Sequence, residues 1–279
     1  MTTEDAPSPF ATTADRLEDT RERVVSFLRD RVIESGHEGV VVWLNDTLEP
    51  AVIAMLAADA LGAERVCALR SPTDRDREAV GGDLLASGLG IECHEIPIAP
   101  LRDRFEDTIA PKINPDNGAP TARSARDRLR MAVLYYAAET RGRLVAGTLN
   151  RTRWLLGAAT KGGTAVGDIL PLGHRYETEV RALAEHLGIP EDLFETRPVP
   201  VDGYDADDVA SPEAIDGILY RLIDEDKGLT RTATEVGVEP DLVRACARRH
   251  AATAHKRVPP PTPEDDDRHE FFHEIELRF

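Results

Sequence analysis

The chain has 279 residues, of which 41% are hydrophobic and only 5% aromatic, and its formal net charge is −17. This length accommodates one large domain whose core is built mainly from Ala, Val, Leu and Ile. The excess of carboxylates repels nucleic acids and anionic membranes, so neither is an expected partner. No stretch approaches the roughly 18 apolar residues of a membrane span, and the N-terminus lacks signal-peptide features. We therefore expect a cytoplasmic protein.

Lysine is scarce, because only four of the 34 basic residues are lysines. An acidic, lysine-poor surface suits a high-salt cytoplasm, where the mutual repulsion of carboxylates is screened. The composition thus predicts a halophilic protein. The three cysteines, Cys67, Cys93 and Cys246, show no paired spacing, and we expect them to be small core residues.

Helical and strand-like hydrophobic patterns alternate along most of the chain. The predicted helices cover residues 14–33, 50–61, 76–88 and 122–140, with shorter ones to about 250. The predicted strands cover residues 39–44, 65–70, 91–98 and 143–148. The prolines, asparagines and glycine of 111–120 predict a surface loop.

This alternation is typical of an α/β fold with a doubly wound, Rossmann-like parallel sheet flanked by helices. Ligands of such sheets bind beyond the carboxyl ends of the strands, which points to the loops after Leu44 and Ala146. We expect a flexible N-terminal tail at 1–13, the α/β domain at 14–263 and an acidic C-terminal tail at 264–279.

The second of those loops carries a specific resemblance. The segment GTLNRTRWLLGAATKGGTAVGDILPLGHRYETEVRALAEHLGIPEDL at 147–193 resembles the ammonia-dependent NAD synthetases, whose run reads approximately GTGNKSE, TKYGDGGxDxxP and LYKTxVRxLAxxLGIP. The segments ARDRLRM at 125–131 and HKRVPPPTP at 255–263 are similar to two further motifs of that family. The resemblance covers about residues 14–263.

The resemblance implies a five-stranded parallel sheet of the adenine nucleotide alpha hydrolase type. It also implies a homodimer with a dinucleotide substrate near the subunit interface. Such enzymes use ATP and Mg²⁺ to activate nicotinate adenine dinucleotide, and ammonia then attacks the adenylate. An adenine nucleotide or dinucleotide is therefore the expected ligand, and ATP and Mg²⁺ are the expected cofactors if the chain is active.

The first loop departs from the family's pyrophosphate loop, S-G-G-x-D-S. In the same register the chain has no glycine and no serine, but Asn45, Asp46, Thr47, Leu48, Glu49 and Pro50. One interpretation is an ATP loop that has degenerated, because glycines let backbone amides approach phosphates. The alternative is a plain helix start, capped by Asp46 or Thr47 and with Pro50 in the first turn.

Three further charged positions also differ from the family. The metal-binding Glu of GTGNKSE is Arg153, the Asp of TKYGD is Thr164, and the Lys of LYKT is Glu177. A cation in place of a metal ligand removes the ligand and opposes the ion, so no metal is predicted at Arg153. We predict instead that Arg153 approaches Glu49, because a buried carboxylate needs a partner.

Five residues match the family in type and are candidates for nucleotide binding: Thr148, Lys161, Arg128, Arg130 and Asp168. Each has a structural alternative: Thr148 as a helix cap, Lys161 and Asp168 as an ion pair, and the arginines as a solvated helix face. The catalytic residue is not fixed by the sequence, and its candidates are Glu49, Lys161 and Asp168.

Three functions remain open. The first is a family member that has lost or weakened amidation and keeps a nucleotide-binding or regulatory role, for example in a heteromer with an active synthetase. The second is an active synthetase with a rearranged loop, in which Glu49 and Asp168 hold the metal. The third is a structural dimer without a ligand.

Overall fold

The structure is a computed structural model that describes residues 8–45, 47–71, 80–113, 119–163, 167–190, 193–194, 201 and 211–258. Its centre is a sheet of four parallel strands in the order β3-β2-β1-β4. The strands are β1 (Gly39–Trp43), β2 (Val66–Arg70), β3 (Glu92–Glu95) and β4 (Arg143–Val145). Because the chain leaves β3 and returns on the other side of β1, the switch point of the sheet lies between β1 and β4.

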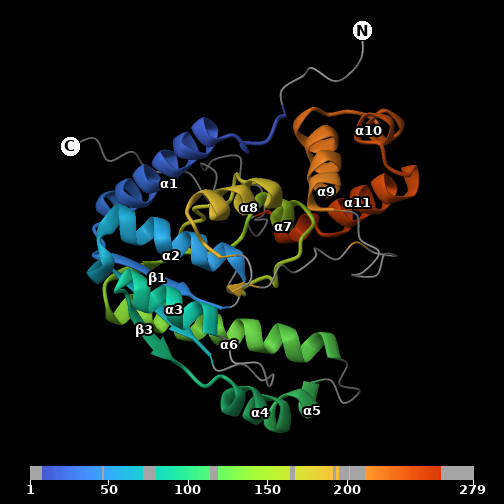
Figure 1. Ribbon diagram of the computed structural model, residues 1–279. Helices are drawn as coiled ribbons and strands as arrows, with labels where there is room; N and C mark the ends of the chain where they lie inside the picture. Colours follow the sequence, from blue (N-terminus) through green and yellow to red (C-terminus); the bar gives the residue numbers. More distant parts are fainter. Residues whose placement is uncertain are drawn as a thin grey trace, which may run out of the picture.

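Alternation along β1 assigns its side chains to two separate layers. Val40 and Val42 pack into one core, while Val41 and Trp43 pack into another. The first core is covered by α1 (Ala14–Glu34), α2 (Leu48–Leu61) and α8 (Glu177–His186), and the second by α6 (Ala119–Thr140). Figure 1 shows these helices on opposite sides of the strands. Two covered faces are the arrangement that a parallel sheet requires.

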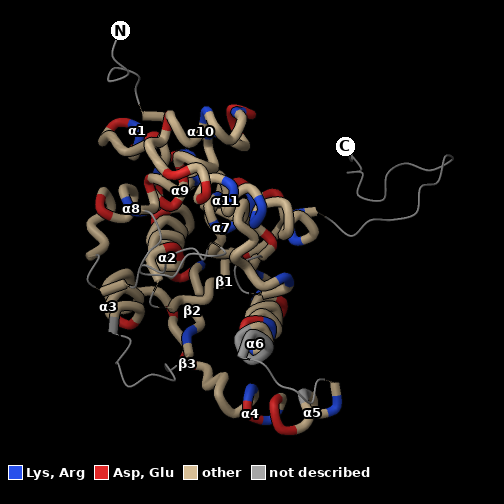
Figure 2. The backbone as a smooth tube through the Cα atoms, turned by 90° about the vertical axis from the view of Figure 1, so that its right-hand side faces the viewer, with Lys and Arg blue, Asp and Glu red and all other residues tan. Residues whose placement is uncertain are grey.

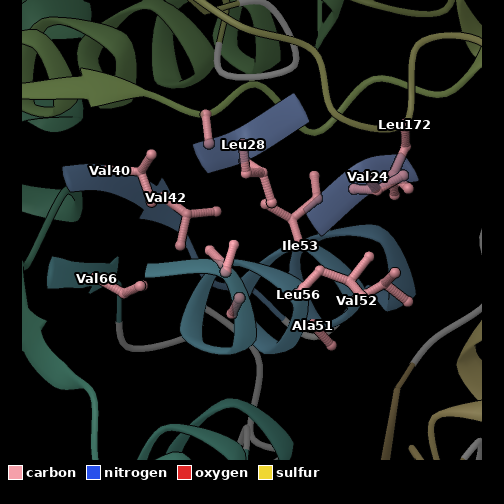
Figure 3. Close-up of a cluster of buried hydrophobic side chains, with 14 of the residues drawn as sticks. Val24, Leu28, Val40, Val42, Ala51, Val52, Ile53, Leu56, Val66 and Leu172 are labelled. Carbon is pink, nitrogen blue, oxygen red and sulfur yellow. The ribbon is translucent and has the colours of Figure 1, made fainter. Parts of the chain in front are cut away.

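Helix α2 is the central element of the first core. Eleven of its fourteen residues are buried, since it contacts α1, α8, α3 (Val80–Leu89) and the sheet. Figure 3 shows Ile53 and Leu56 of α2 among Leu28 of α1 and Val42 of β1. A helix that is apolar on all sides is stable only inside such a layer. The position of Glu49 in its first turn is therefore fixed by packing.

The remaining helices follow β3 or β4 along the chain. They are α4 (Ala99–Thr108), α5 (Ala110–Ile113), α7 (Arg151–Leu155), α9 (Pro212–Leu219), α10 (Leu229–Val236) and α11 (Pro240–Ala252). Single turns occur at Ala63–Arg65, Tyr220–Asp224 and Ala254–Lys256. Helices α7, α9, α10 and α11 share a third hydrophobic core, and Figure 1 shows α9–α11 grouped at one end of the molecule.

The predicted fold class is confirmed, with local corrections. The loop predicted at 111–120 is wrong where it is described, because α5 extends to Ile113 and α6 begins at Ala119. The implied fifth strand is reduced to a single parallel bridge between Ala146 and Ile169. Helix α2 begins at Leu48, two residues before its predicted start.

Residues 8–13 fall within the predicted tail, yet they pack against the domain. Ala11 is buried and its backbone N–H donates to Oε1 of Glu179 at 3.0 Å. The ring of Phe10 makes edge-to-face contacts with Tyr176 and Tyr220. Residues 1–7 and the acidic C-terminal tail lie outside the described part of the chain.

Charged residues are distributed unevenly over the described fold. Figure 2 shows acidic positions on helices throughout the fold and a group of basic positions on α11. No helix among the described residues is long and apolar enough to cross a membrane. The cysteines are free, with Cys67 and Cys246 buried and Cys93 partly buried.

Candidate functional site

The loop after β1 uses its own side chains to satisfy its backbone. Oδ1 of Asn45 accepts hydrogen bonds from the backbone N–H of Thr47 at 3.0 Å and from its hydroxyl at 2.7 Å. Thr47 precedes α2, but its side chain does not cap the helix, so that part of the structural alternative is wrong. Pro50 lies in the first turn and has no N–H to offer. Asp46 lies outside the described residues.

Glu49 is buried and paired with arginine. Only 4% of its surface is exposed, and its Oε1 lies 2.7 Å from Nε of Arg153 in α7. The same Nε lies 3.3 Å from Oε2 of Glu177, the first residue of α8. The predicted contact between Arg153 and Glu49 is therefore confirmed, and Glu177 is a third member of the cluster.

Asn150 connects the cluster, and sequence reasoning did not single it out. It caps α7, since its Oδ1 accepts from the backbone N–H of Arg153 at 2.9 Å. Its Nδ2 donates to Glu177 at 2.7 Å and to Glu49 at 3.4 Å. The helix cap predicted at Thr148 is thus supplied two residues later. The only signal was that Asn150 lies in the quoted GTLN segment, directly before a charged helix.

The charges of the cluster explain the pKa directions. Burial acts to lower the pKa of Arg153, but the carboxylates of Glu49 and Glu177 outweigh it and hold that pKa above its usual value. Burial, followed by the charge of Glu49, raises the pKa of Glu177, although Arg153 and Asn150 oppose the shift. Two acids share one guanidinium, so the cluster is one positive charge short when both are ionised.

Positions 153 and 177 carry charges opposite to those in the NAD synthetase motifs GTGNKSE and LYKT. Where the run has Glu and Lys, this chain has Arg153 and Glu177, and the structure places them in contact. A magnesium ion requires several oxygen ligands at about 2.0–2.1 Å in near-octahedral geometry. Here the guanidinium of Arg153 binds the carboxylate of Glu49, which the ion would need as a ligand. The residues present therefore do not fit a magnesium ion at Glu49.

A second buried acid supports the cluster from the C-terminal helices. Asp216 of α9 is fully buried and accepts from Oγ1 of Thr152 at 2.6 Å and from the backbone N–H of Thr178 at 2.8 Å. The hydroxyl of Thr152 in turn accepts from the backbone N–H of Glu177. Burial raises the pKa of Asp216 despite these hydrogen bonds. The N-termini of α7 and α8 are thus fixed to α9.

Asp168 performs a structural role at the end of β4. Its Oδ2 accepts from the backbone N–H of Val145 at 2.8 Å, and its Oδ1 accepts from the hydroxyl of Tyr135 at 3.0 Å. Burial and this hydrogen bond raise the pKa of Tyr135 to about 12. Among the described residues, Asp168 forms no ion pair with Lys161, so that alternative is wrong where it can be seen.

Lys161 lies at another part of the molecule, beside the turn at Ala254–Lys256. Its Nζ donates to the backbone carbonyl of His255 at 3.2 Å, and its side chain is exposed. Lys256 reaches back to the carbonyls of Gly157 and Ala159 at 2.7 and 3.0 Å. These cations hold the segment after α7 against the end of α11. Lys161 remains accessible to a ligand.

The two arginines of α6 differ in environment. Arg128 is exposed, and the one hydrogen bond that it makes to the described residues goes to its own helix, at the carbonyl of Ser124. The guanidinium of Arg130 lies 5.2 Å from the ring centroid of Trp43, at the carboxyl end of β1. Thr148 is half-buried and makes no hydrogen bond to the described residues, and Thr164 lies outside them. The described candidates therefore do not form one cluster: Glu49 contacts Arg153, whereas Asp168 binds Tyr135 and Lys161 binds the backbone of His255.

Comparison with known proteins identifies the family. The sequence model of the NAD synthase family matches residues 20–260. The NH(3)-dependent NAD(+) synthetase of Halobacterium salinarum is 32% identical over 268 residues, which cover 92% of this chain and 97% of that protein. Two solved structures superpose with a TM-score of 0.74, each covering 89% of this chain and 99% of the other. They are an NH3-dependent NAD synthetase from Campylobacter jejuni, 27% identical, and an NMN synthetase from Francisella tularensis, 25% identical. The chain belongs to the NAD synthase family.

Proposed function

We propose that this family member has lost or weakened ATP-dependent amidation and keeps a nucleotide-binding or regulatory role. The observation that carries the proposal is the 2.7 Å contact between Arg153 and Glu49. This contact places a fixed positive charge on the carboxylate that would otherwise be available to a metal ion. Formation of an adenylate depends on neutralising the phosphate charge of ATP with correctly placed groups. An arginine at position 153, in place of the family's metal-binding Glu, therefore affects the chemical step directly.

The loop after β1 supports the same proposal. Phosphate cradles depend on free backbone N–H groups at a helix N-terminus. The N–H of Thr47 is already bound to Asn45, and Pro50 removes another donor from the first turn. The described part of this loop therefore offers fewer donors to a pyrophosphate than a glycine-rich turn does.

The proposed ligand is a nicotinate-containing dinucleotide or an adenine nucleotide. The Halobacterium relative is named for NAD and the Francisella structure for NMN, so both a dinucleotide and a mononucleotide should be tried. Arg128, Arg130 and Lys161 are the cations that we propose for phosphate or carboxylate contacts. We propose a homodimer, and a heteromer with an active synthetase as the form in which regulation would operate.

The second candidate is an active ammonia-dependent synthetase with a rearranged loop. It is favoured by the 32% identity to the Halobacterium enzyme across 97% of that protein. One assay separates the two. The full chain in high KCl is supplied with ATP, Mg²⁺, ammonia and nicotinate adenine dinucleotide, and NAD is measured with a coupled dehydrogenase. We expect no NAD, while turnover comparable to that of the Halobacterium enzyme, run in parallel, would overturn the proposal.

Binding is tested separately from turnover. Isothermal titration and thermal unfolding with the dinucleotide, with ADP and with nicotinate mononucleotide should reveal stabilisation by at least one of them, because a ligand that binds only the native state raises stability. If none gives heat or stabilisation, the chain has no site for these ligands, as the alternative of a structural dimer requires. The matched variant R153E/E177K restores the charges of the family run, and we expect it to bind Mn²⁺ more tightly than the natural chain does.

A further inference from the structure

We propose that Cys67, Glu92 and His94 form a binding site for a zinc-like transition metal ion, at the end of the sheet opposite Glu49. The thiol Sγ, one carboxylate oxygen and one imidazole nitrogen lie within 4.8 Å of one another. Sulfur, nitrogen and oxygen donors together are the set that Zn²⁺ accepts in proteins. A tetrahedral zinc ion holds its ligand atoms roughly 3.4 Å apart, so a small inward movement of these side chains is sufficient.

The strand register produces the convergence. Cys67 of β2 is the direct partner of Glu92 of β3, and Leu69 is the partner of His94. Cys67 faces the core under α6, and residues two apart on a strand share a face, so all three donors lie on the α6 side of the sheet. Cys93, which lies between the other two in β3, packs against the opposite core. The site is therefore built from adjacent strands and not from mobile loops.

The guanidinium of Arg141 already lies against Glu92 and His94, where the metal ion would bind. Arg141, in the turn after α6, donates to both carboxylate oxygens of Glu92, and its Nη2 lies 3.0 Å from Nε2 of His94. Nε2 of His94 also lies 2.7 Å from Oε1 of Glu92. An uncharged imidazole nitrogen either donates or accepts, so Nε2 satisfies one of these two neighbours and not both. A metal ion that receives lone pairs from both His94 and Glu92 removes this conflict.

The surroundings allow Arg141 to leave and the ion to enter. The side chains of Glu92 and His94 are each 42% exposed, and that of Arg141 is 33% exposed. Exposed ion pairs contribute little to stability, so displacement of Arg141 into water is a small cost. Cys67 is buried, and burial raises the pKa of its thiol. Binding therefore releases the thiol proton to solvent as the metal–sulfur bond forms.

The test uses the full chain, without a histidine tag and under reducing conditions, titrated with Cd²⁺ and Zn²⁺. We expect the ultraviolet charge-transfer absorption of a Cd–thiolate bond at one equivalent, and a rise in Tm with Zn²⁺. H94Q should raise the metal concentration needed for both effects at least tenfold. C67S should abolish the absorption. C93S is the matched control and should behave like the natural chain. R141Q removes the competing cation and should tighten binding about two- to fivefold.

Several results would overturn the proposal. One is a folded natural chain that shows no Cd–thiolate absorption at one equivalent of metal. Another is an absorption that survives C67S, or that C93S abolishes, because the thiol would then be a different one. If C67S fails to fold, the metal affinity of H94Q tests the site instead. The side chain of His94 is half exposed, so its replacement leaves the core intact. Equal affinity of H94Q and the natural chain would refute the site.

Discussion

Replacement of Arg153 by methionine tests whether the guanidinium holds two buried acids in place. The substitution keeps a long side chain but removes the charge, and it takes from Glu49 and Glu177, at 4% and 5% exposure, their cationic partner among the described residues. Breaking a buried ion pair in this way typically costs about 3–5 kcal/mol. Glu177, whose pKa is raised by burial, can limit this cost by taking up a proton. For a carboxyl with an ordinary pKa of 4.5, that uptake costs about 3.4 kcal/mol at pH 7 and about 0.7 kcal/mol at pH 5.

The destabilisation by R153M should therefore depend strongly on pH. We expect a loss of about 3–5 kcal/mol in the free energy of unfolding at pH 7, falling below about 2 kcal/mol at pH 5. Urea unfolding followed by circular dichroism at both pH values, in constant KCl, gives the two numbers. R31M is the control, since the exposed pair of Arg31 with Glu34 should contribute about 0.2–1 kcal/mol at either pH. Equal losses for R153M at pH 5 and pH 7 would refute the argument from buried charge.

Three further predictions concern the buried acid, the core and the surface. The raised pKa of Glu177 means that its contribution to stability is complete below pH 4.5 and is lost as the pH rises through the folded-state pKa. E177Q should therefore gain stability relative to the natural chain as the pH rises from 5 to 7, in paired urea titrations; a constant difference would contradict this. Ile53 is fully buried in α2, so I53A should cost about 2–5 kcal/mol in the same assay, whereas a loss below about 1 kcal/mol would show that the layer can collapse. Raising KCl from about 0.1 M to about 1 M shortens the Debye length from about 10 to about 3 Å and screens the net charge of −17. Calorimetry should show a higher Tm at the higher salt, and an unchanged or lower Tm would argue against halophilic adaptation.

The layered fold was predictable because burial leaves a regular trace in the sequence. The run Val40 to Trp43 is apolar at every position, which is typical of a strand covered on both faces, and the structure distributes those residues between two cores. The prolines around 111–120 misled the prediction, because Pro111 is the second residue of a helix, where its missing N–H has no consequence.

The candidate site was predictable only in part. The pairing of Arg153 with Glu49 was predictable from their opposite charges, because a carboxylate that is buried beyond the strand ends needs a cationic partner. The roles of Asn150 and Asp216 could not be predicted in this way. Their hydrogen bonds to other side chains join residues 27 to 101 positions apart, and a polar side chain that is satisfied by tertiary contacts has no periodic signal.

The hydrogen bonds of Asp216 also limit how the molecule can move. Because this one carboxylate binds Thr152 at α7 and Thr178 at α8, a hinge between the C-terminal helices and the sheet would have to break three buried or partly buried hydrogen bonds at once. Rotation of those helices as a separate body is therefore costly. We expect α7, α8 and α9 to serve as a stationary frame during any closure around a ligand.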